Sequence, residues 1–229
     1  MAGKPGAIAA FLLVIVLFVA AVLLWSERGQ MAGKNVNATE ECSDSAVIVI
    51  DPGHGGFDGG ASASDGTAEK DINLQIALKV KACLEEKGIQ VVMTREDDVA
   101  EESKLGDMKK RVELINEVKP AITVSIHQNS YSDASIKGAQ VFYYTDSEVS
   151  KEAASIMQEE LRTIDETNKR EIKANNTFYM LKKTETPTII VECGFLSNPE
   201  EAEKLVTESY QDEMAGTICA GIIKWLEQK

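Results

Sequence analysis

The sequence has no surplus of basic residues, and this shortage excludes one class of function. Lysine and arginine together number 24 against 37 acidic residues, so the formal net charge is −13 at pH 7. Because a nucleic-acid-binding surface needs cations against the phosphates, we expect no nucleic-acid partner. The chain also lacks internal repeats. Its 229 residues suffice for one domain with a substantial core and a short extra segment.

Cysteines are few, and none has the spacing of a cysteine-rich metal site. The four are Cys42, Cys83, Cys193 and Cys219. They allow three full disulfide pairings, which an oxidising compartment would permit. However, Cys83 and Cys219 fall on apolar faces of predicted helices, and Cys193 ends a predicted strand. Buried free thiols therefore fit the pattern as well as disulfides do, and the sequence leaves the pairing open.

One long hydrophobic run, residues 7–25, departs from the otherwise ordinary composition. It carries no charge, and about 20 apolar residues cross a bilayer as a helix. Lys4 supplies a positive flank of the kind that stays cytoplasmic. We therefore expect residues 1–25 to be a transmembrane anchor that leaves the rest of the chain outside the cytoplasmic membrane. A cleaved signal peptide, which would give a secreted protein, is the alternative. The polar residues 26–45 are predicted to be a flexible linker to a domain over residues 46–229.

The predicted domain alternates between short apolar runs and helical stripes. Strands are predicted at residues 46–50, 89–94, 121–126, 139–144 and 188–192, with a short extended piece at 178–181. Helices are predicted at residues 70–87, 107–118 and 147–164, and a last one includes Met214 and Leu226. Asp107 is the expected N-cap of the second helix. This alternation predicts a single α/β domain, a mainly parallel sheet covered by helices on both faces.

Four polar side chains fall at the ends of these elements. The only two histidines, His54 and His127, each follow a predicted strand. Glu69 lies in the first turn of the first predicted helix, and Glu192 closes the last predicted strand. Each of them alone reads more simply as a structural residue; a glutamate in a first helical turn, for example, complements the helix dipole. Together, however, they fall at the carboxyl ends of the strands, where such sheets bind ligands.

These residue types in this arrangement point to metal-assisted hydrolysis. Two imidazoles and one carboxylate are a ligand set of catalytic zinc, which leaves the fourth position for water. A second carboxylate near the metal supplies the general base that hydrolysis requires. The residues therefore predict a hydrolytic zinc site with His54 and His127 as ligands.

Five motifs in fixed order identify a family. They are residues 51–56 (DPGHGG), 69–71 (EKD), 94–95 (TR), 125–129 (SIHQN) and 191–198 (VECGFLSN). This series resembles the type 3 catalytic domain of the N-acetylmuramoyl-L-alanine amidases, and the resemblance covers essentially residues 46–229. It implies a mixed, mostly parallel sheet with helices on both faces. It also implies one Zn²⁺ per domain, with His54, Glu69 and His127 as ligands and Glu192 as the catalytic glutamate.

The implied reaction is hydrolysis of the amide bond between N-acetylmuramic acid and L-alanine in peptidoglycan, with Glu192 accepting the proton of the attacking water. Gln128 and Cys193 depart from the commonest family pattern, but neither change removes a ligand or an acid. Three further residues match family positions and are candidates for substrate binding: Asn129, Arg95 and Arg111. For the two arginines, structural ion pairs with neighbouring acids are the alternative.

Within the family, small single-domain members with an N-terminal anchor resemble the germination-specific amidases of spore-forming bacteria. Residues 168–173 and 178–182 carry this likeness. It implies a role in the spore cortex, where stripped glycan strands go on to form muramic-δ-lactam.

Residues 165–177 are polar and lack an apolar stripe, so we expect no internal helix that blocks the site. Control would then come from expression timing, the membrane tether, zinc supply or a regulatory protein partner. A zinc peptidase acting on stem peptides and an inactive wall-binding module are the alternative functions.

Overall fold

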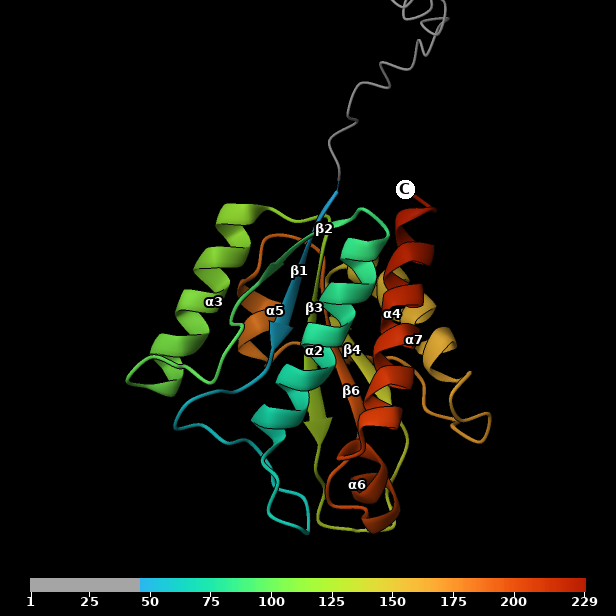
Figure 1. The fold of residues 1–229 in the computed structure, drawn as a ribbon. Coiled ribbons are helices and arrows are strands. Elements are labelled where there is room, and N and C mark those ends of the chain that lie inside the picture. The colour runs from blue at the N-terminus through green and yellow to red at the C-terminus, as the bar shows by residue number, and fades with distance from the viewer. Residues whose placement is uncertain (1–45) are drawn as a thin grey trace, which may run out of the picture. The chain divides into compact units, whose positions relative to one another are not determined.

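The computed structural model describes residues 46–229, shown as a coloured ribbon in Figure 1. The predicted anchor at residues 7–25 and the predicted linker lie outside the described residues. Within the described part, no helix has the length and apolar character that a membrane crossing requires. The strands are β1 (Val47–Pro52), β2 (Gln90–Met93), β3 (Ile122–Asn129), β4 (Gln140–Tyr144), β5 (Lys173–Asn175) and β6 (Thr188–Phe195). The helices are α2 (Glu69–Glu86), α3 (Lys104–Val118), α4 (Glu148–Leu161), α5 (Tyr179–Lys183), α6 (Pro199–Leu205) and α7 (Glu208–Leu226).

The strands form one six-stranded sheet in the order β2-β1-β3-β6-β4-β5. β1 pairs in parallel with β2 and β3, and β3 pairs in parallel with β6. β4 runs antiparallel to β6, while β5 is parallel to β4. The prediction of a mixed, mostly parallel sheet is therefore confirmed. Its central strands, β1, β3 and β6, end side by side at the same edge, because parallel neighbours share their direction.

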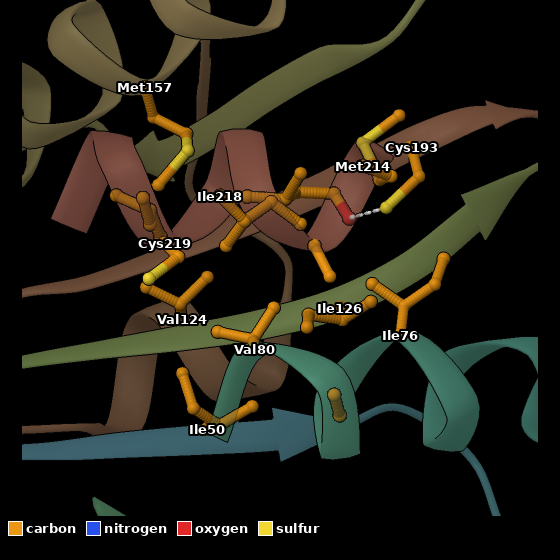
Figure 2. Packing of buried hydrophobic residues seen from close by; sticks show 14 of the residues in the cluster. Ile50, Ile76, Val80, Val124, Ile126, Met157, Cys193, Met214, Ile218 and Cys219 are labelled. Carbon is orange, nitrogen blue, oxygen red and sulfur yellow. Dashed lines mark hydrogen bonds between the residues drawn. The ribbon is translucent and has the colours of Figure 1, made fainter. Parts of the chain in front are cut away.

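Both faces of the sheet are covered, as predicted. In β1, Ile48 and Ile50 pack into the large core cluster beneath α2, α4 and α7. The intervening Val49 points the other way and packs with residues of α3 and α5. Figure 2 shows the large cluster, where Ile50 and Val124 of the sheet approach Val80 of α2. The period-2 alternation of side chains along a strand explains this division into two cores.

A disulfide joins Cys83 of α2 to Cys219 of α7, which decides the state of these two cysteines, while Cys42 lies outside the described residues. The two residues are 136 positions apart, and the bond links two helices that pack side by side on one face of the sheet. Cys193 stays a buried free thiol on β6 (Figure 2). Burial raises the pKa of the Cys193 thiol above its usual range, which makes this thiol unreactive.

Three predictions of local structure were wrong. α3 begins at Lys104, because Ser103 is its N-cap and accepts a hydrogen bond from the Gly106 N–H. Asp107 lies within the first turn and pairs with Arg111 instead. The piece predicted to be extended at residues 178–181 belongs mostly to the short helix α5. The apolar residues of α5 lie on the side of this short helix that faces the sheet. A run of four residues is too short to show whether its apolar positions have the period of a helix or of a strand.

The structure also contains elements that the sequence pattern did not predict. β5 is three residues long and mostly exposed, so it has no apolar run. α6 follows an Asn198 N-cap with Pro199 in the first turn, which is a local start signal for a helix. β3 and β6 both continue past their predicted ends. His127 therefore lies within β3 rather than after it, and Glu192 lies within β6 rather than at its end, since backbone pairing continues where the apolar run stops.

Candidate metal centre and active site

Three predicted ligand residues converge at the carboxyl edge of the central strands. His54 lies in the loop after β1, His127 lies in β3, and Glu69 is the first residue of α2. One donor atom from each lies within 4.8 Å of the others. Glu69 Oε1 is 3.2 Å from His54 Nε2 and 3.0 Å from His127 Nδ1. The two imidazole rings meet edge to face with centroids 5.0 Å apart. Three donors that point at one spot make a potential metal site.

Glu69 is held as an ionised carboxylate. Its Oε2 accepts a hydrogen bond from the Ala61 N–H at 2.8 Å, and its Oε1 accepts one from the Gln128 N–H at 3.1 Å. Burial acts to raise the pKa of Glu69, but hydrogen bonds and positive charge from His127 and His54 outweigh it. The pKa of Glu69 therefore lies well below its usual range. The side chain presents a fixed negative oxygen to the site at neutral pH.

The orientation of His54 is set from behind. Its Nδ1 lies 2.9 Å from Asp58 Oδ2, and Lys104 Nζ lies 3.0 Å from the same oxygen. With the proton on Nδ1 donated to Asp58, Nε2 is left as a lone-pair donor facing Glu69 and His127. A carboxylate behind a histidine in this way is the usual means of fixing the tautomer of a metal ligand. This role of Asp58 was not predicted from the sequence, although an acid four residues after a histidine ligand is a local signal for it.

Two glycines leave the space that the ligands occupy. A Cβ on Gly53 would lie only 2.1 Å from a carbon of the His127 ring. A Cβ on Gly60 would lie 2.4 Å from Glu69 Oε2, and Gly60 also has a positive φ of 69°. The glycines near His54 therefore serve the packing of the other two ligands as well as the bending of the turn.

Glu192 faces the same site from β6. It is the register partner of His127 across the parallel β3–β6 pair, which places both side chains on the same face of the sheet. Among the described residues, its Oε2 is buried without a hydrogen-bond partner. Burial raises the pKa of Glu192 to about 7; the positive His127 opposes this rise and the negative Glu69 adds to it. A carboxyl group with a pKa near neutrality suits a group that takes up and returns a proton.

His54, His127 and Glu192 line a cavity of about 260 Å³, whereas the buried Glu69 is not among its lining residues. One wall carries His54, His127 and Glu192 together with the buried Asp51 and Arg111. The apolar lining residues form an apolar wall and come from α3, β6 and the start of α5: Met108, Phe178, Tyr179, Met180 and Ile190. None of the lining residues belongs to residues 165–177, the segment predicted to hold no blocking helix.

The three candidate substrate-binding residues have different surroundings. Arg111 lines the cavity and forms the ion pairs expected of the structural alternative, 2.8 Å from Asp51 and 2.7 Å from Asp107. Arg95 is buried, does not line the cavity, and donates hydrogen bonds to main-chain carbonyls rather than to acids. Asn129 accepts a hydrogen bond from the Ser130 N–H and does not line the cavity. A substrate contact of Asn129 stays a prediction.

The donor set fits zinc. Two imidazole nitrogens and one carboxylate oxygen are the ligands of hydrolytic zinc sites, and no cysteine takes part. The cavity beside the donors leaves room for water and substrate, as a catalytic rather than a structural site requires.

Comparison with known proteins gives a consistent result. Residues 48–224 match the protein family described as N-acetylmuramoyl-L-alanine amidase. The germination-specific N-acetylmuramoyl-L-alanine amidase of Bacillus subtilis is 38% identical over 192 residues, which is 80% of this chain and 81% of that protein.

Solved structures agree with the sequence matches. The CwlD amidase from Clostridioides difficile, solved in complex with the GerS lipoprotein, is 40% identical with a TM-score of 0.77, covering 80% of this chain and 100% of that one. The catalytic domain of the amidase CwlV from Paenibacillus polymyxa is 34% identical with a TM-score of 0.72, covering 80% of this chain and 99% of that one.

Proposed function

The chain belongs to the N-acetylmuramoyl-L-alanine amidases, and on that premise we propose that it is a zinc-dependent enzyme of spore-cortex peptidoglycan. Membership of the family makes it a peptidoglycan hydrolase that cuts the amide between muramic acid and L-alanine. The proposal adds the metal, the role of each residue, the place of action and the biological setting.

The observation that carries the zinc proposal is the convergence of one donor atom each from His54, Glu69 and His127 within 4.8 Å of one another. When bound there, zinc supplies Lewis acidity for the amide carbonyl and the attacking water. The chain's own residues do the remaining work. Glu192, buried beside His127 with a pKa of about 7, accepts the proton of the water and returns it to the departing alanine nitrogen. The apolar wall excludes bulk water and packs against the methyl groups on both sides of the amide.

Two similarities support the spore-cortex setting. One relative is named as germination-specific, and the solved CwlD amidase is 40% identical over 80% of this chain. We infer that the enzyme strips stem peptides from cortex glycan, leaving strands from which muramic-δ-lactam forms. Because that CwlD structure contains a lipoprotein, a regulatory protein partner is part of the proposal.

The proposed location is outside the cytoplasmic membrane, with residues 7–25 as the anchor, or after cleavage in a secreted form. Two features support it. The uncharged run has the length of a membrane span. The disulfide between Cys83 and Cys219 is of a kind that persists in oxidising compartments.

The deciding experiment is mass spectrometry of purified cortex and vegetative peptidoglycan after digestion with the purified protein, with and without zinc. We expect zinc-dependent release of stem peptides that begin with a free L-alanine amino group. Cleavage inside the stem peptide would instead identify a zinc peptidase. Binding to peptidoglycan without cleavage, by a zinc-loaded protein, would identify a wall-binding module. The Glu192→Gln variant is the matched control for a contaminating hydrolase.

A further inference from the structure

The main chain at His54 is strained. His54 has a φ of 61°, in the left-handed region that non-glycine residues adopt uncommonly. The next residue, Gly55, has a φ of 146° and no space for a side chain, since its Cβ would lie 2.6 Å from the Val99 carbonyl. Such a conformation persists only where the surroundings fix it. Neighbouring groups must therefore hold this turn in place.

Two buried guanidinium groups hold it through three consecutive carbonyls. Arg95 Nε donates to Pro52 O at 3.0 Å and to His54 O at 2.7 Å. Arg111 donates to the same two oxygens, from Nη1 at 2.7 Å and from Nη2 at 2.5 Å. The Gly53 carbonyl between them accepts from Arg95 Nη2 and from the Asn73 amide, each at 3.1 Å. All three carbonyls of the turn therefore accept two hydrogen bonds each.

The two arginines are also costly where they are. Arg95 and Arg111 are 5% and 6% exposed. Arg111 is neutralised by Asp51 and Asp107, whereas no ion pair joins Arg95 to any acid in residues 46–229. Burial and the nearby charge of Arg111 lower the pKa of Arg95. A buried cation with only main-chain partners is an expensive way to pack a loop, which indicates that it serves the site.

Only arginine can make this contact. Its planar fork offers five N–H donors in fixed directions, whereas lysine offers one rotating ammonium that cannot span three carbonyls. The geometry points to Arg95 and Arg111 as positioning residues that clamp the turn of residues 52–54, so that His54 Nε2 is held in place for the metal. This inference rests on the proposed zinc site, and it replaces the predicted contact of these arginines with substrate.

The test measures zinc affinity by chelator competition in the purified full-length protein, for wild type, Arg95→Lys and Arg111→Lys. We expect each lysine variant to raise the zinc Kd by 10–100-fold, the usual cost of losing a group behind a metal ligand. At saturating zinc, each variant should recover most of its turnover with an unchanged KM. Each variant is an independent readout, so one that fails to fold leaves the other to decide.

Arg162→Lys is the matched control. Its Nη2 also donates to a main-chain carbonyl, that of Arg170, and to the Glu171 carboxylate, but Arg162 does not line the cavity. This variant should lower the melting temperature without changing the zinc Kd. If Arg95→Lys and Arg111→Lys both bind zinc with the wild-type Kd, the two arginines do not clamp the turn. If they also have a raised KM for substrate, the arginines contact substrate as the sequence predicted. A wild-type protein that binds no zinc would instead overturn the proposed metal site itself.

Discussion

Replacing Gly53 with alanine tests whether His127 is a metal ligand without touching His127 itself. The Cβ of an alanine at this position would lie 2.1 Å from His127 Cε1, 2.2 Å from Nε2 and 2.6 Å from Nδ1. Gly53 is not among the residues with positive φ, so its main chain accepts alanine. The damage should therefore fall on the imidazole ring and not on the backbone.

The distances set the size of the effect. Non-bonded carbon atoms approach to about 3.5 Å, so the ring must retreat by about 1.4 Å. Metal–ligand distances tolerate only about 0.2 Å of change. The displaced ring can therefore no longer bind together with His54 and Glu69. We expect a rise of at least about 100-fold in the zinc Kd, beyond the range for groups behind the ligands. The metal-free protein should lose about 1–3 kcal/mol of stability from overpacking.

The assay is chelator competition for zinc together with thermal unfolding of the metal-free protein. Gly216→Ala is the control, because Gly216 lies in α7 and an added Cβ meets nothing within 4 Å. That variant should gain about 0.5–1 kcal/mol of helix stability and keep its zinc Kd. A folded Gly53→Ala protein with wild-type zinc affinity would refute the assignment of His127 as a ligand.

Four further predictions follow from the site and the core. Glu192→Gln should lose at least about 100-fold in turnover while keeping its zinc, and near-normal turnover would place the general base elsewhere. His127→Ala should purify without stoichiometric zinc by elemental analysis; full occupancy would contradict the proposed ligand set. The pKa of Glu192 is raised from 4.5 to about 7, so the metal-free native state keeps a proton that the unfolded state releases. As the pH rises from 4.5 to about 7, the free energy of unfolding of the metal-free wild type, measured by urea denaturation, should therefore fall relative to that of Glu192→Gln. Parallel pH profiles of the two proteins would contradict a raised pKa of the buried Glu192 carboxyl. Replacing Cys83 and Cys219 by serine should lower the free energy of unfolding by up to about 5 kcal/mol, because the disulfide closes a loop of 136 residues and so reduces the entropy of the unfolded chain. Zinc binding should be retained. An unchanged free energy of unfolding would mean that the disulfide does not form in solution.

The parts of the fold that the sequence predicts are those governed by burial. The apolar run at β1 and the helical stripe of α2 reflect how each element contacts the core, so their positions were correct to within one or two residues. The convergence of His54, Glu69 and His127 also follows from the pattern. Parallel strands share one carboxyl edge, and a helix that follows such a strand starts there.

The parts that the sequence could not predict depend on partners far along the chain. β5 exists because its backbone pairs with β4, although its side chains are mostly exposed. The start of α3 is an exception: its cap, Ser103, accepts a hydrogen bond from the Gly106 N–H three residues on, so this contact is local. The disulfide needed the packing of α2 against α7. For β5 and the disulfide, the deciding contact lies outside the local sequence window.

The two arginines show the same limit at the site itself. Their positions in the motifs placed them near the ligands, but a motif cannot say whether a guanidinium faces substrate, an acid or the main chain. Among residues 46–229, the structure places three local costs near one site: the left-handed His54, the Glu192 Oε2 without a hydrogen-bond partner and the buried Arg95 without an acid. Natural sequences tolerate such violations mainly at functional sites, where the rest of the fold compensates. A ligand that binds only the folded state also adds stability, by RT ln(1 + [L]/Kd). Bound zinc would therefore offset the strain that the site imposes on the metal-free domain.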